Sequence, residues 1–288
     1  MKEELKIIRF NMINNLIIAI IKVIGGLYFK LDSLYADGMH TFSDFITDIV
    51  SVISSKITKK KPTKYHPSGF GQVEYLTNIF VGVFLFALAT YIVADSILKK
   101  SVVIIPLISV LIVLIVCLIL KMVSIVVTNK VGKEINSNVL ITAVQESKTD
   151  LYSTFGVIII SILLRYSDVI PILKYSDLVG SIIIGVIIYK TALTIIISNS
   201  LSIISEVDFD KEKMDLINEY LVNYKEIKDS KLELMKYGPY YKLNIILELD
   251  QDISLRKAEL LLNNIKRKIM KNKKLKVKYV TIYITDNV

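Results

Sequence analysis

The chain has 288 residues, of which 53% are apolar, and it carries a formal net charge of +9. Several apolar runs approach the length that crosses a bilayer, which excludes a soluble globular protein. No basic groove with interleaved aromatic residues accompanies the charge, so we expect no nucleic-acid partner and attribute the charge to basic loops beside anionic membrane lipid. The single Cys117 excludes an internal disulfide.

Six segments are long and apolar enough to predict membrane-spanning helices. They cover about residues 10–30, 34–57, 74–98, 102–128, 136–164 and 171–200. Basic residues precede the first segment as in a signal peptide, but no small-residue cleavage site follows, so we expect this segment to be retained. Lysines crowd the second and fourth connections, which predicts that both termini face the cytoplasm.

The composition changes after Ser205 from apolar runs to mixed, charged sequence. Helical spacing of apolar residues over 208–224 is followed by alternating strand patterns at 231–236 and 240–249, with a turn at Gly238 and Pro239 between them. A helix over 254–272 and a strand over 275–285 complete an α-β-β-α-β order. We therefore predict a transmembrane domain over residues 1–206 and a cytoplasmic α+β domain over residues 207–288.

Two matching pentads place polar groups inside the predicted spans. HTFSD, residues 40–44, and ESKTD, residues 146–150, share an acid or His, a hydroxyl residue at the second and fourth positions, and a final Asp. His40, Asp44 and Asp48 recur every four residues, so they line one face of a helix about 6 Å apart. Asp44 and Asp150 both fall near the middle of their spans.

Ionisable groups at the bilayer centre cost at least about 2.5 kcal/mol each unless a partner offsets the cost. A divalent cation is one such partner, because one imidazole and three carboxylates supply the four ligands of a tetrahedral transition-metal site. The alternative is that these acids are protonated or pair with lysines in or beside the spans. The candidate lysines are Lys22, Lys121, Lys148 and Lys190.

The stretch SLYADGMHTFSD, residues 33–44, resembles the second-helix signature of the cation diffusion facilitator transporters. KVIGGLYF, HPSGFGQVE and DLVGSIIIGVIIY are similar to further family segments, and the final α-β-β-α-β order is similar to the family's metallochaperone-like domain. The resemblance implies a homodimer, not an enzyme, that exports divalent metal in exchange for protons and uses no organic cofactor. It also implies a metal site made by His40, Asp44, Glu146 and Asp150.

The departures from the family pattern concern the metal. Glu146 stands where the family usually has His or Asp, and an oxygen-rich site favours Mn²⁺ or Fe²⁺, although Zn²⁺, Co²⁺ and Cd²⁺ remain candidates. Phe70 replaces the second His of a loop motif, so we expect His66 to be structural. The cytoplasmic domain contains no His or Cys, and we expect it to serve dimerisation.

Two further acids are candidates for supporting roles. Asp37 lies nearly one turn before His40, where its carboxylate could orient the imidazole or only be solvated near the outer end of the helix. Asp48 lies one turn beyond Asp44, where it could guide ions or relay protons from the cytoplasm, or cap the helix or pair with a lysine.

A non-transporting membrane adaptor is the alternative function, in which the pentads only hold helices together. No HExxH or GxSxG motif supports an intramembrane hydrolase. We expect the protein in a prokaryotic cell membrane.

Overall fold

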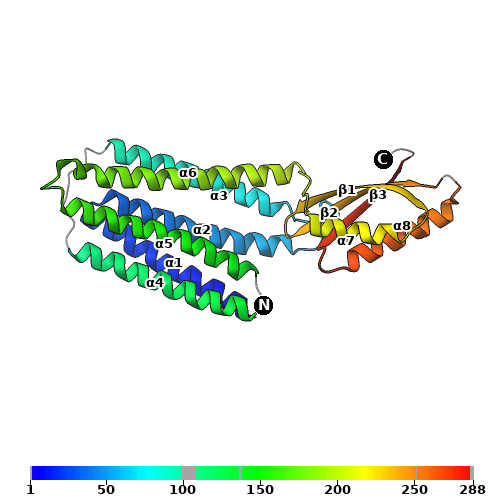
Figure 1. Ribbon diagram of the computed structural model, residues 1–288, viewed down its shortest axis with the longest axis horizontal. Coiled ribbons are helices and arrows are strands. Elements are labelled where there is room, and N and C mark those ends of the chain that lie inside the picture. Colours follow the sequence, from blue (N-terminus) through cyan, green and yellow to red (C-terminus); the bar gives the residue numbers. More distant parts are fainter. Residues whose placement is uncertain (1, 99–107, 136–137, 251, 286–288) are drawn as a thin grey trace. The chain divides into compact units, whose positions relative to one another are not determined.

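The computed structural model describes residues 2–98, 108–135, 138–250 and 252–285. Six long helices lie within the described part of residues 2–203, and a small α+β region follows them in the sequence (Figure 1). The long helices are α1 (Lys2–Phe29), α2 (Asp32–Thr58), α3 (Val73–Leu98), α4 (Ile108–Glu134), α5 (Asn138–Arg165) and α6 (Ser176–Ile203). The described part of each predicted span is thus helical, although residues 102–107 of the fourth and residues 136–137 of the fifth lie outside the described residues.

Five of these helices are long and apolar enough to cross a membrane by length and composition, among the residues that the structure describes. The one left out is α2, because its polar stripe, which includes His40, Asp44 and Asp48, lowers the mean hydropathy. The start of α6 also differs from the prediction. A short 3₁₀ helix, η1 (Pro171–Tyr175), precedes it, with Pro171 in the first turn where a missing N–H costs nothing.

The chain forms two compact units, which we describe separately. Unit 1 comprises Met1–Ser51 and Phe80–Ile196, and unit 2 comprises Val52–Ile79 and Ile197–Val288. In unit 1, α4 packs against both α1 and α5, as Figure 1 shows. An apolar core of Leu, Ile, Val and Ala side chains fills unit 1, including Leu34, Ile92, Leu114, Val157 and Ile188.

A glycine allows α1 and α2 to approach each other closely in unit 1. A Cβ added at Gly38 would lie 2.7 Å from the backbone nitrogen of Val23 and 2.9 Å from Cβ of Lys22. Small residues at such crossings let helix backbones pack together inside a membrane. This close contact holds the pentad of α2 against α1.

Unit 2 contains the α-β-β-α-β order that the sequence predicts. Its elements are α7 (Lys211–Val222), β1 (Ile227–Tyr237), β2 (Tyr240–Leu249), α8 (Leu255–Lys271) and β3 (Val277–Thr285). β1 pairs antiparallel with β2 through the predicted turn, where Gly238 has a φ of +59°. β2 pairs in parallel with β3, and α8 makes the crossover that parallel pairing requires.

The core of unit 2 lies between the sheet and its two helices. Ile217 of α7, Ile265 of α8, and Leu243, Ile245 and Leu247 of β2 are buried together. Because side chains alternate along a strand, the apolar residues of β2 share one face of the sheet, and both helices pack on that face.

Candidate metal centre

Helix α2 presents His40 and Asp44 on one face, and its first turn is fixed by α6. The carboxylate of Asp177 accepts hydrogen bonds from the backbone nitrogens of Asp32 and Ser33, each at 2.8 Å. These N–H groups have no acceptor within the helix, so an acid from a neighbouring helix satisfies them. Asp177 therefore anchors the start of the helix that carries the pentad.

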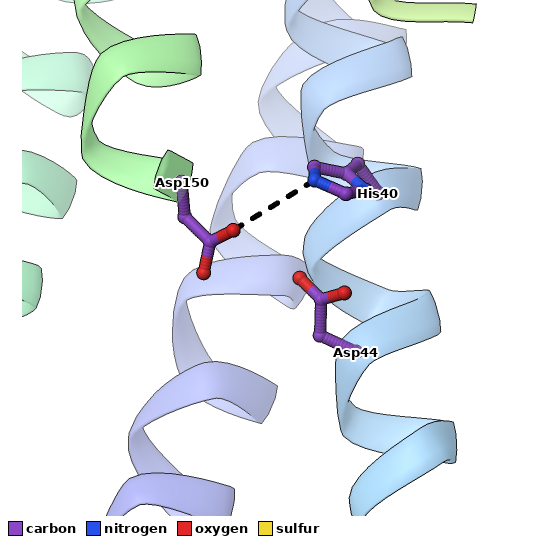
Figure 2. A group of neighbouring side chains, drawn as sticks. All are labelled: His40, Asp44 and Asp150. Atoms are coloured by element: carbon purple, nitrogen blue, oxygen red, sulfur yellow. Dashed lines mark ion pairs between the residues drawn. The ribbon is translucent and has the colours of Figure 1, made fainter. Parts of the chain in front are cut away.

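Three predicted site residues converge between α2 and α5 (Figure 2). Ligand atoms of His40, Asp44 and Asp150 all lie within 4.8 Å of one another, and we call these three residues the acid–imidazole group. Nε2 of His40 lies 3.7 Å from Oδ1 of Asp150. His40 is buried, and the side chain of Asp150 is only 13% exposed.

The group can accept a cation. Oδ2 of Asp44 is buried and has no hydrogen-bond partner among the described residues, so this carboxylate oxygen is a free acceptor for a cation. Transition metals bind imidazole nitrogen and carboxylate oxygen at about 2.0–2.2 Å, which brings two ligands of one ion to at most about 4.4 Å apart. A small contraction of the group would therefore suffice to hold one ion.

The fourth predicted ligand, Glu146, lies in α5 one helical turn before Asp150, but its side chain lies outside the described residues. Asp48 is half-buried one turn beyond Asp44 and does not join the acid–imidazole group. Its role as an ion guide stays a prediction.

The expectation for Asp37 is wrong. Instead of orienting His40, Asp37 forms a buried ion pair with Lys22, with 2.7 Å between Nζ and Oδ2, and its Oδ1 accepts a hydrogen bond from Ser153 at 2.6 Å. Nδ1 of His40 is buried without a hydrogen-bond partner in the described part of the chain. Lys22 of α1 pairs with the carboxylate, because a buried ammonium requires a partner of opposite charge.

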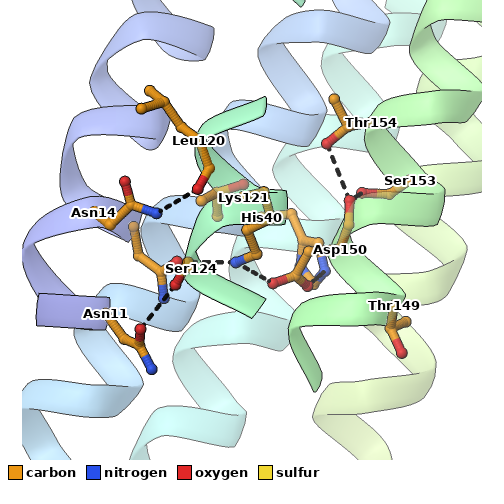
Figure 3. A network of polar contacts seen from close by, with 12 residues as sticks. Asn11, Asn14, His40, Leu120, Lys121, Ser124, Thr149, Asp150, Ser153 and Thr154 are labelled. Atoms are coloured by element: carbon orange, nitrogen blue, oxygen red, sulfur yellow. Dashed lines mark hydrogen bonds and ion pairs between the residues drawn. The ribbon is translucent and has the colours of Figure 1, made fainter. Parts of the chain in front are cut away.

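One of the lysines that the sequence offers as an alternative partner does contact the group. Nζ of Lys121, from α4, lies 2.7 Å from Oδ2 of Asp150 and donates a hydrogen bond to Oδ1 of Asn15 at 2.9 Å (Figure 3). Asp150 therefore belongs to the acid–imidazole group and also forms an ion pair with Lys121. The contact of Asn15 was not predicted, although an Asn at that depth in an apolar run is a signal for a polar partner.

Lys22 is held by hydroxyl groups as well as by Asp37. It donates hydrogen bonds to Thr154 at 2.7 Å and to Thr41 at 3.3 Å. Thr41 belongs to the α2 pentad, and Thr154 lies one turn beyond Asp150. The pentad pattern includes Thr41 but did not predict Lys22 as its partner, and the sequence did not indicate Thr154, because a hydroxyl on a membrane helix usually bonds its own backbone.

The chain is similar in sequence to known membrane transporters. The model of the cation efflux transmembrane domain family matches residues 8–204. An uncharacterized transporter of Methanocaldococcus jannaschii is 27% identical over 99% of this chain and all of its own length. The manganese efflux system protein MneP of Bacillus subtilis is 25% identical over 92% of this chain and 90% of its own. The manganese efflux system protein MneS of the same bacterium is 22% identical over 88% of this chain and 86% of its own.

Proposed function

The chain belongs to the cation efflux family, the cation diffusion facilitators, and is therefore a membrane transporter of metal cations; from this premise we propose that it exchanges divalent metal for protons. The metal site that we propose consists of His40, Asp44, Glu146 and Asp150. It would be loaded from the cytoplasm and emptied on the opposite side of the membrane.

The convergence of His40, Asp44 and Asp150 within 4.8 Å is the observation that carries the proposal. Two acids and an imidazole from two helices come together in unit 1, whose core is otherwise apolar apart from further buried polar groups beside the site, such as Lys22 and Lys121. Ionisable groups inside a membrane mark ion pathways, because their cost is otherwise not repaid.

We propose Mn²⁺ as the principal substrate. Carboxylate oxygens suit Mn²⁺, whereas imidazole-rich sites suit Zn²⁺, and the proposed ligands are three carboxylates and one imidazole. The names of two relatives, both manganese efflux proteins, support the same metal. Fe²⁺, Co²⁺, Cd²⁺ and Zn²⁺ are the competitors to compare.

Proton exchange follows from the chemistry of the ligands. Carboxylates and imidazole bind metal only in their deprotonated forms, so metal and protons compete for the same ligand atoms. Protons that return from the other side convert the same groups to weaker ligands and release the metal. One set of side chains thereby binds the two ions alternately.

We also propose a homodimer with both termini in the cytoplasm. The resemblance to the family supports the dimer. Excess lysine in the connection between α2 and α3, at Lys59, Lys60, Lys61 and Lys64, supports the orientation. Light scattering of the purified protein would show twice the chain mass of 32.7 kDa, after correction for detergent.

Transport in inside-out vesicles tests the function. We expect saturable Mn²⁺ uptake that increases when the vesicle interior is acidic and stops when the proton gradient is collapsed. Asp44→Asn and Asp150→Asn each remove a ligand charge without changing side-chain size, so both should abolish uptake. Asp168→Asn, which changes an exposed acid of unit 1 beyond the end of α5, is the matched control and should transport normally.

Each outcome has a clear meaning. Uptake that persists in either ligand variant would refute the site, and uptake that ignores the gradient would refute proton exchange. The adaptor alternative predicts no flux in any of these proteins.

A further inference from the structure

The acid–imidazole group has a neighbour that a metal-binding site does not require. Lys121 is 4% exposed, and its ammonium contacts Oδ2 of Asp150 at 2.7 Å. The other oxygen of the same carboxylate, Oδ1, is the atom that lies 3.7 Å from Nε2 of His40. Asp150 therefore has one oxygen directed at His40 and the other bound to the ammonium of Lys121 (Figure 3).

Lys121 is held in place from the side opposite Asp150. Asn15 of α1 accepts a hydrogen bond from its ammonium at 2.9 Å. The neighbouring Asn14 donates to the backbone oxygen of Leu120 at 3.2 Å and so ties α1 to the same turn of α4. These contacts fix the ammonium at the edge of the acid–imidazole group.

Further polar contacts join α1 and α4 beyond Lys121. Asn11 accepts hydrogen bonds from Ser124 at 2.7 Å and from Thr128 at 3.0 Å. Lys121, Ser124 and Thr128 continue the buried face of α4 that begins with Val110, Leu114 and Cys117. The polar contacts start at Lys121, where this face changes from apolar to polar and where it contacts Asp150.

A metal ion bound to Asp150 and the ammonium of Lys121 would repel each other. A dication bound through Oδ1 of Asp150 would lie within a few ångströms of the ammonium on Oδ2, in a region where buried charges are poorly screened. The ammonium also compensates part of the negative charge of Asp150, which would otherwise attract the metal. Lys22 does not act in the same way, because Asp37 already compensates its charge.

We propose that Lys121 is a tethered cation that competes with the transported metal for Asp150. Its ammonium compensates Asp150 when no metal is bound, is repelled or displaced when metal binds, and favours release of the metal when it returns. Lys121 is thus a positioning residue that lowers metal affinity and accelerates turnover. This inference rests on the proposed metal site.

Metal affinity of the full-length protein in detergent tests the inference. Lys121→Met keeps the length of the side chain and removes the charge. We expect the Kd for Mn²⁺, measured by calorimetry, to fall at least about tenfold, because the opposing charge lies close to the ion. In vesicles, KM and the maximal rate should both fall, since tighter binding slows release. A purely structural role predicts the opposite change in Kd, a weaker site.

Two further variants separate charge from packing. Lys121→Arg keeps a positive charge beside Asp150 and should keep the wild-type Kd. Lys190→Met makes the same substitution at an exposed position of α6 and should leave Kd, KM and the maximal rate unchanged. If Lys121→Met does not give a monodisperse protein, Lys121→Gln provides the same comparison with a hydrogen-bond donor retained.

The inference and the proposed function fail in different ways. An unchanged or higher Kd in both Lys121→Met and Lys121→Gln, with Mn²⁺ binding by the wild type and none by Asp44→Asn, would overturn the inference alone. No Mn²⁺ binding by the wild type would overturn both.

Discussion

His40 supplies the single nitrogen among the proposed ligands, so it should control the choice of metal. Imidazole suits Zn²⁺ and Co²⁺ better than Mn²⁺, whereas carboxylate suits Mn²⁺. We expect His40→Asp to weaken Zn²⁺ binding by more than the roughly 10-fold to 100-fold that loss of an outer-shell partner costs. Mn²⁺ binding should weaken much less, which competition calorimetry with the two metals would measure.

The other histidine of the chain offers a matched control. His66 is exposed in the connection between α2 and α3, where its backbone nitrogen bonds Thr63. His66→Asp should leave the ratio of Zn²⁺ to Mn²⁺ affinity unchanged. An equal loss of both metals in His40→Asp would show that His40 does not discriminate between them.

At the level of single residues, the sequence indicated that His40, Asp44 and Asp150 lie close together but not which atoms contact which partners, and the place of Glu146 stays a prediction. The four-residue spacing of His40 and Asp44 and the matching position of Asp150 were sufficient to place them together. The partners of the two oxygens of Asp150 could not be assigned, because the depth and rotation of α2 and α4 decide that Oδ1 faces His40 and Oδ2 contacts Lys121. The same reason explains the wrong expectation for Asp37, whose partner Lys22 lies on a different helix.

At the level of helices, the crossing of α1 and α2 depends on Gly38. Gly38→Ala would place a methyl group 2.7 Å from the backbone of Val23, so the two helices must separate. Overpacking of this kind typically costs about 1–3 kcal/mol, and we expect a lower midpoint of thermal unfolding together with weaker Mn²⁺ binding.

Gly156 of α5 is the control for this substitution, because a Cβ there meets no atom within 4 Å. Gly156→Ala should stabilise the protein by about 1 kcal/mol through helix propensity alone. A Gly38→Ala protein as stable as Gly156→Ala would contradict the close helix crossing.

Helix α7 gives a pH-dependent prediction outside the membrane. Asp210 is its N-cap and accepts hydrogen bonds from the side chain and the backbone nitrogen of Lys213, which lower the pKa of Asp210 below its ordinary value. A pKa that is lower in the folded than in the unfolded state adds stability above the unfolded pKa of about 3.9. That contribution is lost as the pH falls through the folded pKa.

Hydrogen exchange of the α7 amides in the full-length protein measures this effect. Asp210→Ala should reduce their protection at pH 7, and the difference from the wild type should disappear in strong acid. Asp215→Ala, at an exposed position of the same helix, should show no such dependence. A difference that persists unchanged in strong acid would rule out the charged cap.

At the level of the whole molecule, apolar run length and strand alternation were sufficient to predict the order of the elements. Six helical segments and the α-β-β-α-β order are confirmed, because both patterns record which side chains avoid water. The boundaries between the two compact units are harder to predict from the sequence. The last residues of α2 and α6 and the first residues of α3 belong to the same unit as the sheet. No change of composition marks those boundaries.

The central claim is that one divalent cation binds between α2 and α5 at mid-membrane. Anomalous X-ray diffraction at the manganese edge, on crystals of the wild-type protein grown with Mn²⁺, measures this most directly. We predict one anomalous peak per chain within bonding distance of His40, Asp44 and Asp150, and no peak there in Asp44→Asn crystals. A manganese peak elsewhere in the transmembrane helices, with none between these three side chains, would contradict the account.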